Sequence, residues 1–264
     1  MCKEIYCNSG IILSNQDIAY YIYQMLHKTR GIVFKTTDYG DSSVIVQIFT
    51  EKFGLQSYII NAVKKPKAKI SMNMLQPLHL LDMVVYHKNT GQVQRVAELK
   101  NSPLLQTIPY DVIKSCLAIF LNEVLYKAVR QQSPDENLFD FVFNAVEWLD
   151  HQSNGIANFH LLFLIRLSKC LGFYPDRLMG EADYFDMKNG VFSKYKPEGF
   201  SYLSPPHTQN FYTLLTCSFE QLPALKLSND ERRYLLNKLL EYYALHIDSF
   251  GNIKSHEVLE EVLG

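Results

Sequence analysis

The chain has 264 residues, of which 47% are hydrophobic and 13% aromatic, and its formal net charge is −1 at pH 7. This composition can fill packed cores, so it excludes a disordered or fibrous chain and leaves one large domain or two modest ones. The balanced charge argues against a wholly basic, histone-like polymer binder, although a sum can conceal local imbalance. Five cysteines without CxxC spacing predict no structural metal and no secreted disulfide framework, which indicates a reducing cytoplasm.

Residues 1–24 precede the regular patterning of the chain. Their apolar residues 11–13 are followed by polar ones, and the segment lacks the basic start and the small-residue cleavage site of a signal peptide. We interpret residues 1–24 as a doubtful N-terminal extension in front of Met25, and whether it is translated stays open. No later stretch reaches the ~18 apolar residues of a membrane span, so we expect no membrane insertion.

Five short runs rich in β-branched and aromatic residues follow, separated by turn residues. They cover residues 31–36, 44–49, 55–63, 78–86 and 93–99. Between the third and fourth runs, residues 64–69 (KKPKAK) insert a proline and four positive charges that no sheet interior would accept. Five strands in this length predict a small closed barrel, of which the OB-fold is the commonest nucleic-acid-binding form. We place this OB-fold domain at residues 25–104.

After Pro109 the apolar residues recur at the three- and four-residue spacing of helices. The pattern predicts helices over residues 113–131, 138–149, 158–171 and 230–250. Residues 105–264 therefore form a predicted all-α domain with an irregular insertion at about 173–228, and the fold class is α+β with two domains. We interpret the acidic residues 181–186 in this insertion as a solvated connector.

The neutral net charge conceals opposite regional balances. Residues 25–100 carry 11 basic and 5 acidic side chains, a balance of +6, whereas residues 101–264 carry 14 and 20, a balance of −6. A basic barrel with a lysine-rich loop is typical of a polyanion site. The alternative, a solvated surface that resists aggregation, stays open. By alternation Phe34 and Phe49 are expected inside the barrel, while Tyr39 and Phe53, at turns, are candidates for exposed rings that stack on bases.

Motifs for common enzyme chemistries are missing. The sequence contains no GxGxxG, no phosphate-binding loop ending in Lys-Ser/Thr, no HExxH and no GxSxG. Its eight histidines are scattered without the partners that catalysis or metal binding requires. We therefore expect no enzyme activity, no cofactor and no metal.

Several segments from Met25 onward resemble, in order, landmarks of the RecO family of bacterial recombination mediators, particularly its Bacteroidetes-like members. The landmarks are Thr36–Ser43 with Thr50–Gly54, Asn61–Lys67, Leu75–Leu78, Phe120–Tyr126, Leu138-Phe139, Leu171–Pro175, Tyr243–His246 and Lys254-Ser255. Many family members carry a four-cysteine zinc module after the landmark at Leu171–Pro175, but residues 176–199 contain no cysteine here. The resemblance therefore implies no zinc, and we expect packing of Tyr184, Phe185, Phe192 and Tyr195 to stabilise this region.

The resemblance also implies an activity and partners. Members of the family bind single- and double-stranded DNA, anneal complementary strands and work with RecR. They help RecA to replace the single-strand-binding protein SSB, whose acidic, apolar-tipped C-terminal tail they recognise. We accordingly expect a cytoplasmic, nucleoid-associated mediator of double-strand-break and gap repair that is monomeric when alone. The rival function is a protein–protein adaptor whose small barrel binds a peptide.

Two sets of basic residues are the candidate sites. Barrel residues expected to contact phosphates, which position DNA without reading its sequence, are Lys28, Arg30, Lys35, Lys64, Lys65, Lys67, Lys69 and Arg95. A second set lies on predicted helices and could receive an acidic partner tail or a second strand, and it comprises Arg166, Lys169, Arg232, Arg233 and Lys238. Ordinary surface charge is the alternative for the second set.

Overall fold

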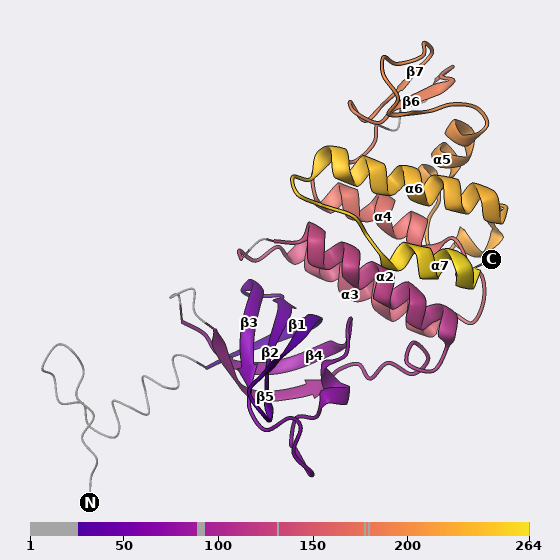
Figure 1. Ribbon diagram of the computed structural model, residues 1–264. Coiled ribbons are helices and arrows are strands. Elements are labelled where there is room, and N and C mark those ends of the chain that lie inside the picture. Colours follow the sequence, from indigo (N-terminus) through magenta and orange to yellow (C-terminus); the bar gives the residue numbers. More distant parts are fainter. Residues whose placement is uncertain (1–25, 89–92, 131, 177, 179, 264) are drawn as a thin grey trace, which may run out of the picture. The chain divides into compact units, whose positions relative to one another are not determined.

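The structure is a computed structural model that describes residues 26–88, 93–130, 132–176, 178 and 180–263 (Figure 1). The chain divides into two compact units with the boundary between Ser102 and Pro103, where the sequence prediction puts the boundary after residue 104. The expected extension over residues 1–24 lies outside the described residues. Among the helices that are described, none combines the length and the apolar character needed to cross a membrane.

The first unit is a closed barrel of five strands. The strands are β1 (Leu26–Tyr39), β2 (Ser43–Thr50), β3 (Gly54–Ile60), β4 (Leu80–Tyr86) and β5 (Gln94–Asn101). Their order around the barrel is β1-β2-β3-β5-β4, with β4 pairing back to β1. All neighbours are antiparallel except β3 and β5, which are parallel. This arrangement confirms the predicted five-stranded OB-fold barrel.

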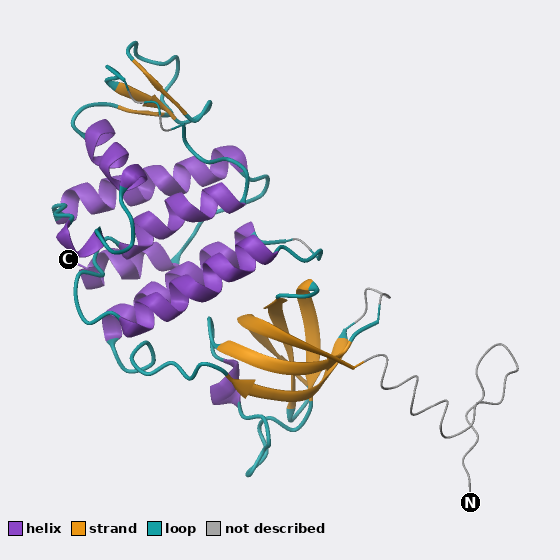
Figure 2. Cartoon of the chain, turned by 180° about the vertical axis from the view of Figure 1, so that it is seen from behind, coloured by secondary structure: helices purple, strands orange, loops and turns teal. Residues whose placement is uncertain are grey.

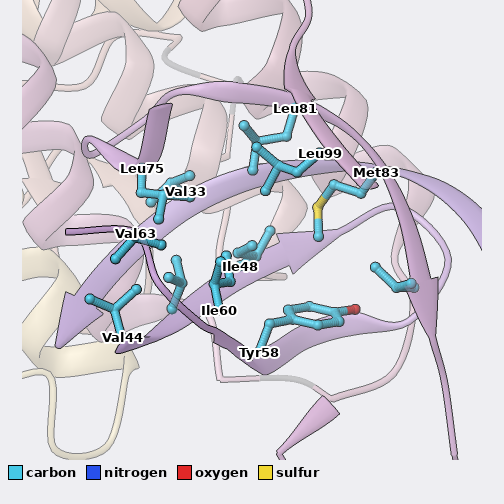
Figure 3. Packing of buried hydrophobic residues seen from close by; sticks show 12 residues of the cluster. Val33, Val44, Ile48, Tyr58, Ile60, Val63, Leu75, Leu81, Met83 and Leu99 are labelled. Atoms are coloured by element: carbon cyan, nitrogen blue, oxygen red, sulfur yellow. The ribbon is translucent and has the colours of Figure 1, made fainter. Parts of the chain in front are cut away.

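Alternating side chains of the strands fill the barrel (Figure 3). Val44, Val46 and Ile48 of β2 point inward and are fully buried, as the period of two requires. Gly31 of β1 lies so close to its neighbours that an added Cβ would stand 2.7 Å from Ile48 Cγ2 and 2.8 Å from Met83 Sδ. Only glycine therefore fits where β1 passes β2 and β4 at this point.

The aromatic residues of the barrel agree only in part with the prediction. Phe34 and Phe49 are buried and stack on each other with ring centroids 5.7 Å apart. The cluster that fills the barrel contains their neighbours Val33 and Ile48 but neither ring, so the prediction that Phe34 and Phe49 lie inside the barrel is wrong, because successive side chains of a strand point to opposite faces. Of the two candidates at turns, Tyr39 is 54% exposed and Phe53 is half-buried against the core. Tyr39 and Phe53 thus both keep part of their rings accessible to solvent.

Helices make up most of the second unit (Figure 2). They are α2 (Val112–Ala128), α3 (Glu136–His151), α4 (Phe159–Cys170), α5 (His207–Thr216), α6 (Asn229–His246) and α7 (Ser255–Leu263). Helix α4 lies between α6 and the pair α2 and α3 (Figure 1). Its sequence is apolar on nearly every face, and nine of its twelve residues are buried, as expected for the central helix of a bundle. Helices α5 and α7 were not predicted.

The predicted insertion at 173–228 is more ordered than its sequence suggests. It contains a three-stranded sheet of β6 (Tyr184–Asp186), β7 (Val191–Ser193) and β8 (Tyr202–Leu203), in the order β7-β6-β8. The interpretation of residues 181–186 as a solvated connector is wrong for Phe185, which is buried and has ring centroids of Phe192 and Phe211 at 4.9 and 4.7 Å. Tyr195, expected to pack there, is 80% exposed.

Two carboxylates anchor segments of the helical unit. Asp150 of α3 is buried and accepts hydrogen bonds from the backbone N–H groups of Gln106, Thr107 and Ile108 at 2.7, 2.9 and 2.8 Å. Glu123 of α2 accepts from the backbone N–H of Ser255 at 2.9 Å, at the start of α7. Burial alone would raise the pKa of Glu123, but hydrogen bonds from Ser255, Lys254 and Lys127 prevail and lower it to about 2. Both carboxylates are therefore ionised at neutral pH.

Candidate nucleic-acid interface

The lysine-rich loop, defined as residues 62–69, is built from two consecutive tight turns. The Lys65 N–H donates to the Ala62 carbonyl at 3.2 Å, and the Ala68 N–H donates to the Lys65 carbonyl at 3.1 Å. In the second turn Pro66 is followed by Lys67 with φ of 65°. Pro followed by a residue of positive φ is the pattern of a type II turn, which favours Gly or Asn at the third position. A lysine at this position is held in a conformation that its backbone disfavours.

Hydrogen bonds attach the loop to the turn between β1 and β2. The Lys64 ammonium group lies 2.8 Å from the Asp38 carboxylate, and the Lys64 N–H donates to the Ser42 carbonyl at 3.5 Å. Tyr39, next to Asp38, has more than half of its side chain exposed. The loop and the turn thus form one surface on which lysines stand beside an exposed ring, as in single-strand binding sites.

Lys65, Lys67 and Lys69 are exposed on the lysine-rich loop. In the part of the chain that the structure describes, no carboxylate lies within 4.0 Å of their ammonium groups. Lys64 is engaged with Asp38, which neutralises its charge. Of the four predicted loop lysines, Lys65, Lys67 and Lys69 are therefore the ones available for phosphate contacts.

Lys69 also lines a groove of about 400 Å³ on the barrel surface. Lys28 of β1 and Lys100 of β5 line the same groove, so the fold brings together two predicted residues, Lys28 and Lys69, that are far apart in sequence. Lys100 was not singled out from the sequence, and no local pattern marks it, because its place depends on the pairing of β5 with β4. The carboxylates of Asp82 and Glu98 also line the groove, which makes its charge mixed.

The other predicted barrel residues lie apart from the loop. Arg30 forms a bidentate ion pair with Glu51, with Nε to Oε2 at 3.1 Å and Nη2 to Oε1 at 2.9 Å. That geometry occupies the guanidinium fork that a phosphate would need. Lys35 is exposed on β1, and Arg95 is exposed on β5 where that strand pairs with β3. The predicted DNA-binding residues thus fall into one group on the loop and its groove and three separate residues, Arg30, Lys35 and Arg95.

The second basic set does not form one surface either. Arg166 of α4 donates to the Tyr174 hydroxyl at 2.5 Å and to the backbone carbonyls of Leu215 and Cys217, which is a structural role. Lys238 pairs with Glu241 at 2.8 Å on the same helix. Lys169 is exposed at the end of α4. Only Arg232 and Arg233, both on α6, line a common pocket.

This small pocket between α4, α6 and α7 combines charge with an apolar lining. Arg232 and Arg233 line it together with the apolar residues Leu236, Leu259 and Leu263. Buried His160 also lines the pocket. Burial, with a smaller contribution from the charge of Arg232, lowers the pKa of His160 to about 3, so the ring is neutral and the positive charge comes from the two arginines. Glu260 also lines the pocket, and Arg233 donates to the Glu260 carbonyl at 3.3 Å, so the charge of the lining is mixed.

Known protein families match both units. Residues 25–102 match the family described as Recombination protein O N terminal, and residues 109–256 match Recombination protein O C terminal. The chain belongs to the RecO family. Proteins named DNA repair protein RecO are similar over nearly their whole length. The Flavobacterium psychrophilum protein is 38% identical over 89% of this chain and 98% of its own, and that of Bacteroides fragilis is 36% identical over 90% and 99%.

As a member of the RecO family, the chain has a role in DNA repair and recombination. The lysine-rich loop and the groove lie within the residues that match the N-terminal RecO family. The pocket extends beyond the C-terminal match, since Leu259, Glu260 and Leu263 follow residue 256. In the part of the chain that is described, no group of three or more His, Cys, Asp or Glu could hold a metal ion.

Proposed function

We propose that this RecO family protein binds single- and double-stranded DNA through the lysine-rich loop and anneals complementary strands. The observation that carries the proposal is the presentation of Lys65, Lys67 and Lys69 on two consecutive turns that are attached to the β1–β2 turn. A loop held in one conformation loses little entropy when it contacts a polyanion. Contacts to phosphates alone leave the base edges of the strand accessible for pairing.

Annealing by this route needs no catalytic side chain and no nucleotide. Two DNA strands repel each other, and a positive surface that holds them lowers this repulsion. We therefore propose a non-enzymatic mediator. Its work with RecR, and its help to RecA in loading onto DNA coated with the single-strand-binding protein, are proposed on the ground of family membership.

The pocket on α6 supports a proposal for the contact with the single-strand-binding protein. We propose that an acidic tail with an apolar tip binds at the surface of this pocket, against its leucines and Arg232 and Arg233 and beside Glu260. Arg232 also donates to the Leu227 carbonyl at 2.7 Å, so it holds the start of α6. Arg233 is exposed and is the arginine better placed to meet a carboxylate of the tail.

A salt titration tests the DNA-binding proposal. The affinity for a labelled single-stranded oligonucleotide is measured by fluorescence anisotropy at several salt concentrations, with the double variant Lys65→Glu/Lys67→Glu. We expect weaker binding and a slope of log affinity against log salt that is shallower by about 0.7 for each lost phosphate contact. The matched control is Lys188→Glu/Lys226→Glu, which makes the same charge change at exposed positions of the helical unit.

Unchanged slope and affinity in the loop variant would contradict the proposal and favour the rival adaptor function. Equal losses in the loop variant and in the control would assign the effect to total charge, not to the loop. An annealing assay with complementary strands and no nucleotide completes the test. We expect the wild-type chain to accelerate annealing and the loop variant to do so less.

A further inference from the structure

A cluster of three rings lies at the start of β1, away from Tyr39 at the end of that strand. His27 belongs to β1, Phe53 to the turn between β2 and β3, and His87 follows β4. The rings of Phe53 and His87 are stacked, with centroids 3.8 Å apart and an interplanar angle of 16°. His27 meets Phe53 edge-on at 5.4 Å. These three residues are called the ring cluster.

The ring cluster is less buried than three other aromatic residues of the barrel. Phe34, Phe49 and Tyr58 are fully buried, whereas His27, Phe53 and His87 are half-buried. Phe53 packs on one side against the barrel core. A pair of stacked rings that remains partly open to solvent can be extended by another planar ring, and every nucleobase has such a face.

Basic residues neighbour the ring cluster in the sequence and in the sheet. Lys52 precedes Phe53 and Lys88 follows His87, and both side chains are exposed. Arg95 is also exposed and lies opposite Tyr86, the neighbour of His87, in the pairing of β4 with β5. The neighbouring carboxylate of Glu51 is engaged by Arg30. The charge near the rings therefore complements a phosphate backbone and not an acidic or neutral ligand.

Buried polar side chains fix the backbone that carries the rings. The Gln94 side chain is buried, and it accepts from the Lys88 N–H at 3.1 Å and donates to the Lys88 carbonyl at 2.8 Å. The Lys52 N–H donates to Oγ1 of buried Thr29 at 3.3 Å. Gln56 donates to the Phe53 carbonyl at 2.7 Å. The backbone beside Phe53 and His87 is thus fixed before any ligand arrives, which reduces the entropy cost of stacking.

We propose that the ring cluster stacks a base of bound single-stranded DNA, while Lys52, Lys88 and Arg95 contact the phosphates beside that base. This inference rests on the proposed DNA binding and adds a contact that involves bases. It places one nucleic-acid contact near each end of β1, the lysine-rich loop with Tyr39 at one end and the ring cluster at the other.

Two oligonucleotides of the same length separate stacking from phosphate contacts. One is oligothymidylate, and the other has the same number of phosphates but abasic sites in place of the bases. We expect the wild-type chain to bind oligothymidylate at least about fivefold more tightly, since a stacked base contributes on the order of a factor of five or more. In His87→Gln this preference should fall by about that factor, with the abasic affinity unchanged and any contribution of Tyr39 retained.

Two further variants make the assignment specific. His87→Phe keeps a ring at this position and should keep the preference for oligothymidylate. If the preference came from the charge of the histidine instead of its ring, both His87→Gln and His87→Phe would lose it. His151→Gln is the matched control, because His151 is exposed on α3 in the other unit, and it should behave as the wild type. Thermal unfolding followed by circular dichroism verifies that each variant is folded.

The outcomes distinguish this inference from the proposal on which it rests. If the wild-type chain binds both oligonucleotides equally, the base contact is refuted and DNA binding through phosphates stands. Equal loss of the preference in His87→Gln and His87→Phe would also overturn the inference. If neither oligonucleotide binds, the proposed DNA binding itself fails.

Discussion

The Lys64 ammonium group lies 2.8 Å from the Asp38 carboxylate and thereby attaches the lysine-rich loop to the turn between β1 and β2. The pair is partly open to solvent, with 34% and 72% of the two side chains exposed, so it stabilises the fold by at most about 1 kcal/mol. Its larger effect is on charge, because Asp38 neutralises one of the four loop lysines. The pair therefore limits how many phosphates the loop can contact.

Replacement of Asp38 by Asn should make Lys64 available to DNA. We expect the slope of log affinity against log salt to become steeper by about 0.7, which corresponds to one more phosphate contact. The free energy of unfolding should change by no more than about 1 kcal/mol. Anisotropy titrations at three salt concentrations measure the slope. A weaker affinity at every salt concentration would show that the position of the loop matters more than its charge.

Lys67→Gly should separate DNA binding from stability. The positive φ of Lys67 costs a non-glycine residue roughly 1 kcal/mol, so glycine should keep or raise the free energy of unfolding while a phosphate contact is lost. Urea unfolding followed by circular dichroism, together with DNA titration, measures both effects. Lys65→Gly is the matched control, since it removes the same charge where no positive φ is recorded and should bring no gain in stability.

Arg233→Glu should weaken binding of the C-terminal tail of the single-strand-binding protein by about tenfold or more, because an attractive charge at the rim of the pocket becomes a repulsive one. Titration of a fluorescent peptide with the sequence of that tail measures the effect. Lys188→Glu, an exposed substitution of equal charge outside the pocket, should leave the affinity unchanged. Equal loss in both variants would refute a specific role for the pocket.

Asp150→Ala should destabilise the helical unit by about 2 kcal/mol or more, since three backbone N–H groups, of which that of Ile108 is buried, lose a charged acceptor. Urea unfolding followed by the fluorescence of Trp148 measures this unit alone. Trp148 is the sole tryptophan of the chain and stacks on Phe159 with ring centroids 5.3 Å apart. A change below about 1 kcal/mol would mean that water replaces the carboxylate.

The pH dependence of stability gives a second readout for Asp150. Burial alone would raise the pKa of Asp150, but hydrogen bonds from Gln106, Ile108 and Thr107 outweigh it and lower the pKa below the ordinary value. Its contribution is therefore complete above the unfolded-state pKa of about 3.9 and is lost as the pH falls through the lower folded-state value. Between pH 7 and pH 3 the wild-type chain should lose more stability than Asp150→Ala.

Long runs with a clear period could be predicted from the sequence. The five barrel strands and helices α2, α3, α4 and α6 each have enough residues to show alternation or a helical stripe. Strands β6, β7 and β8 have only two or three residues each, which is too short for a period to appear. Their stability comes from contacts such as Phe185 with Phe211, which join segments that are distant in sequence.

The sequence predicted the regions that carry the candidate sites but not the partners of the individual side chains. Charge counting by region identified the barrel and its lysine-rich loop, because clustered lysines are visible in the sequence itself. It could not show that Glu51, 21 residues along the chain, engages Arg30, or that Arg166 is bound to backbone carbonyls. The ring cluster was missed for the same reason, since β1, the β2–β3 turn and the end of β4 meet only in the folded barrel.

The barrel is closed by a short parallel pairing between β3 and β5. This pairing is recorded for Tyr58 with Gln94 and for Ile59 with Arg95, whereas β2 and β3 pair over seven positions. Separation of these two pairs would convert the closed barrel into an open sheet with β3 at its edge, and unpaired edges invite association with other chains. Substitutions at Tyr58 or Gln94 thus bear on the solubility of the protein as much as on its fold.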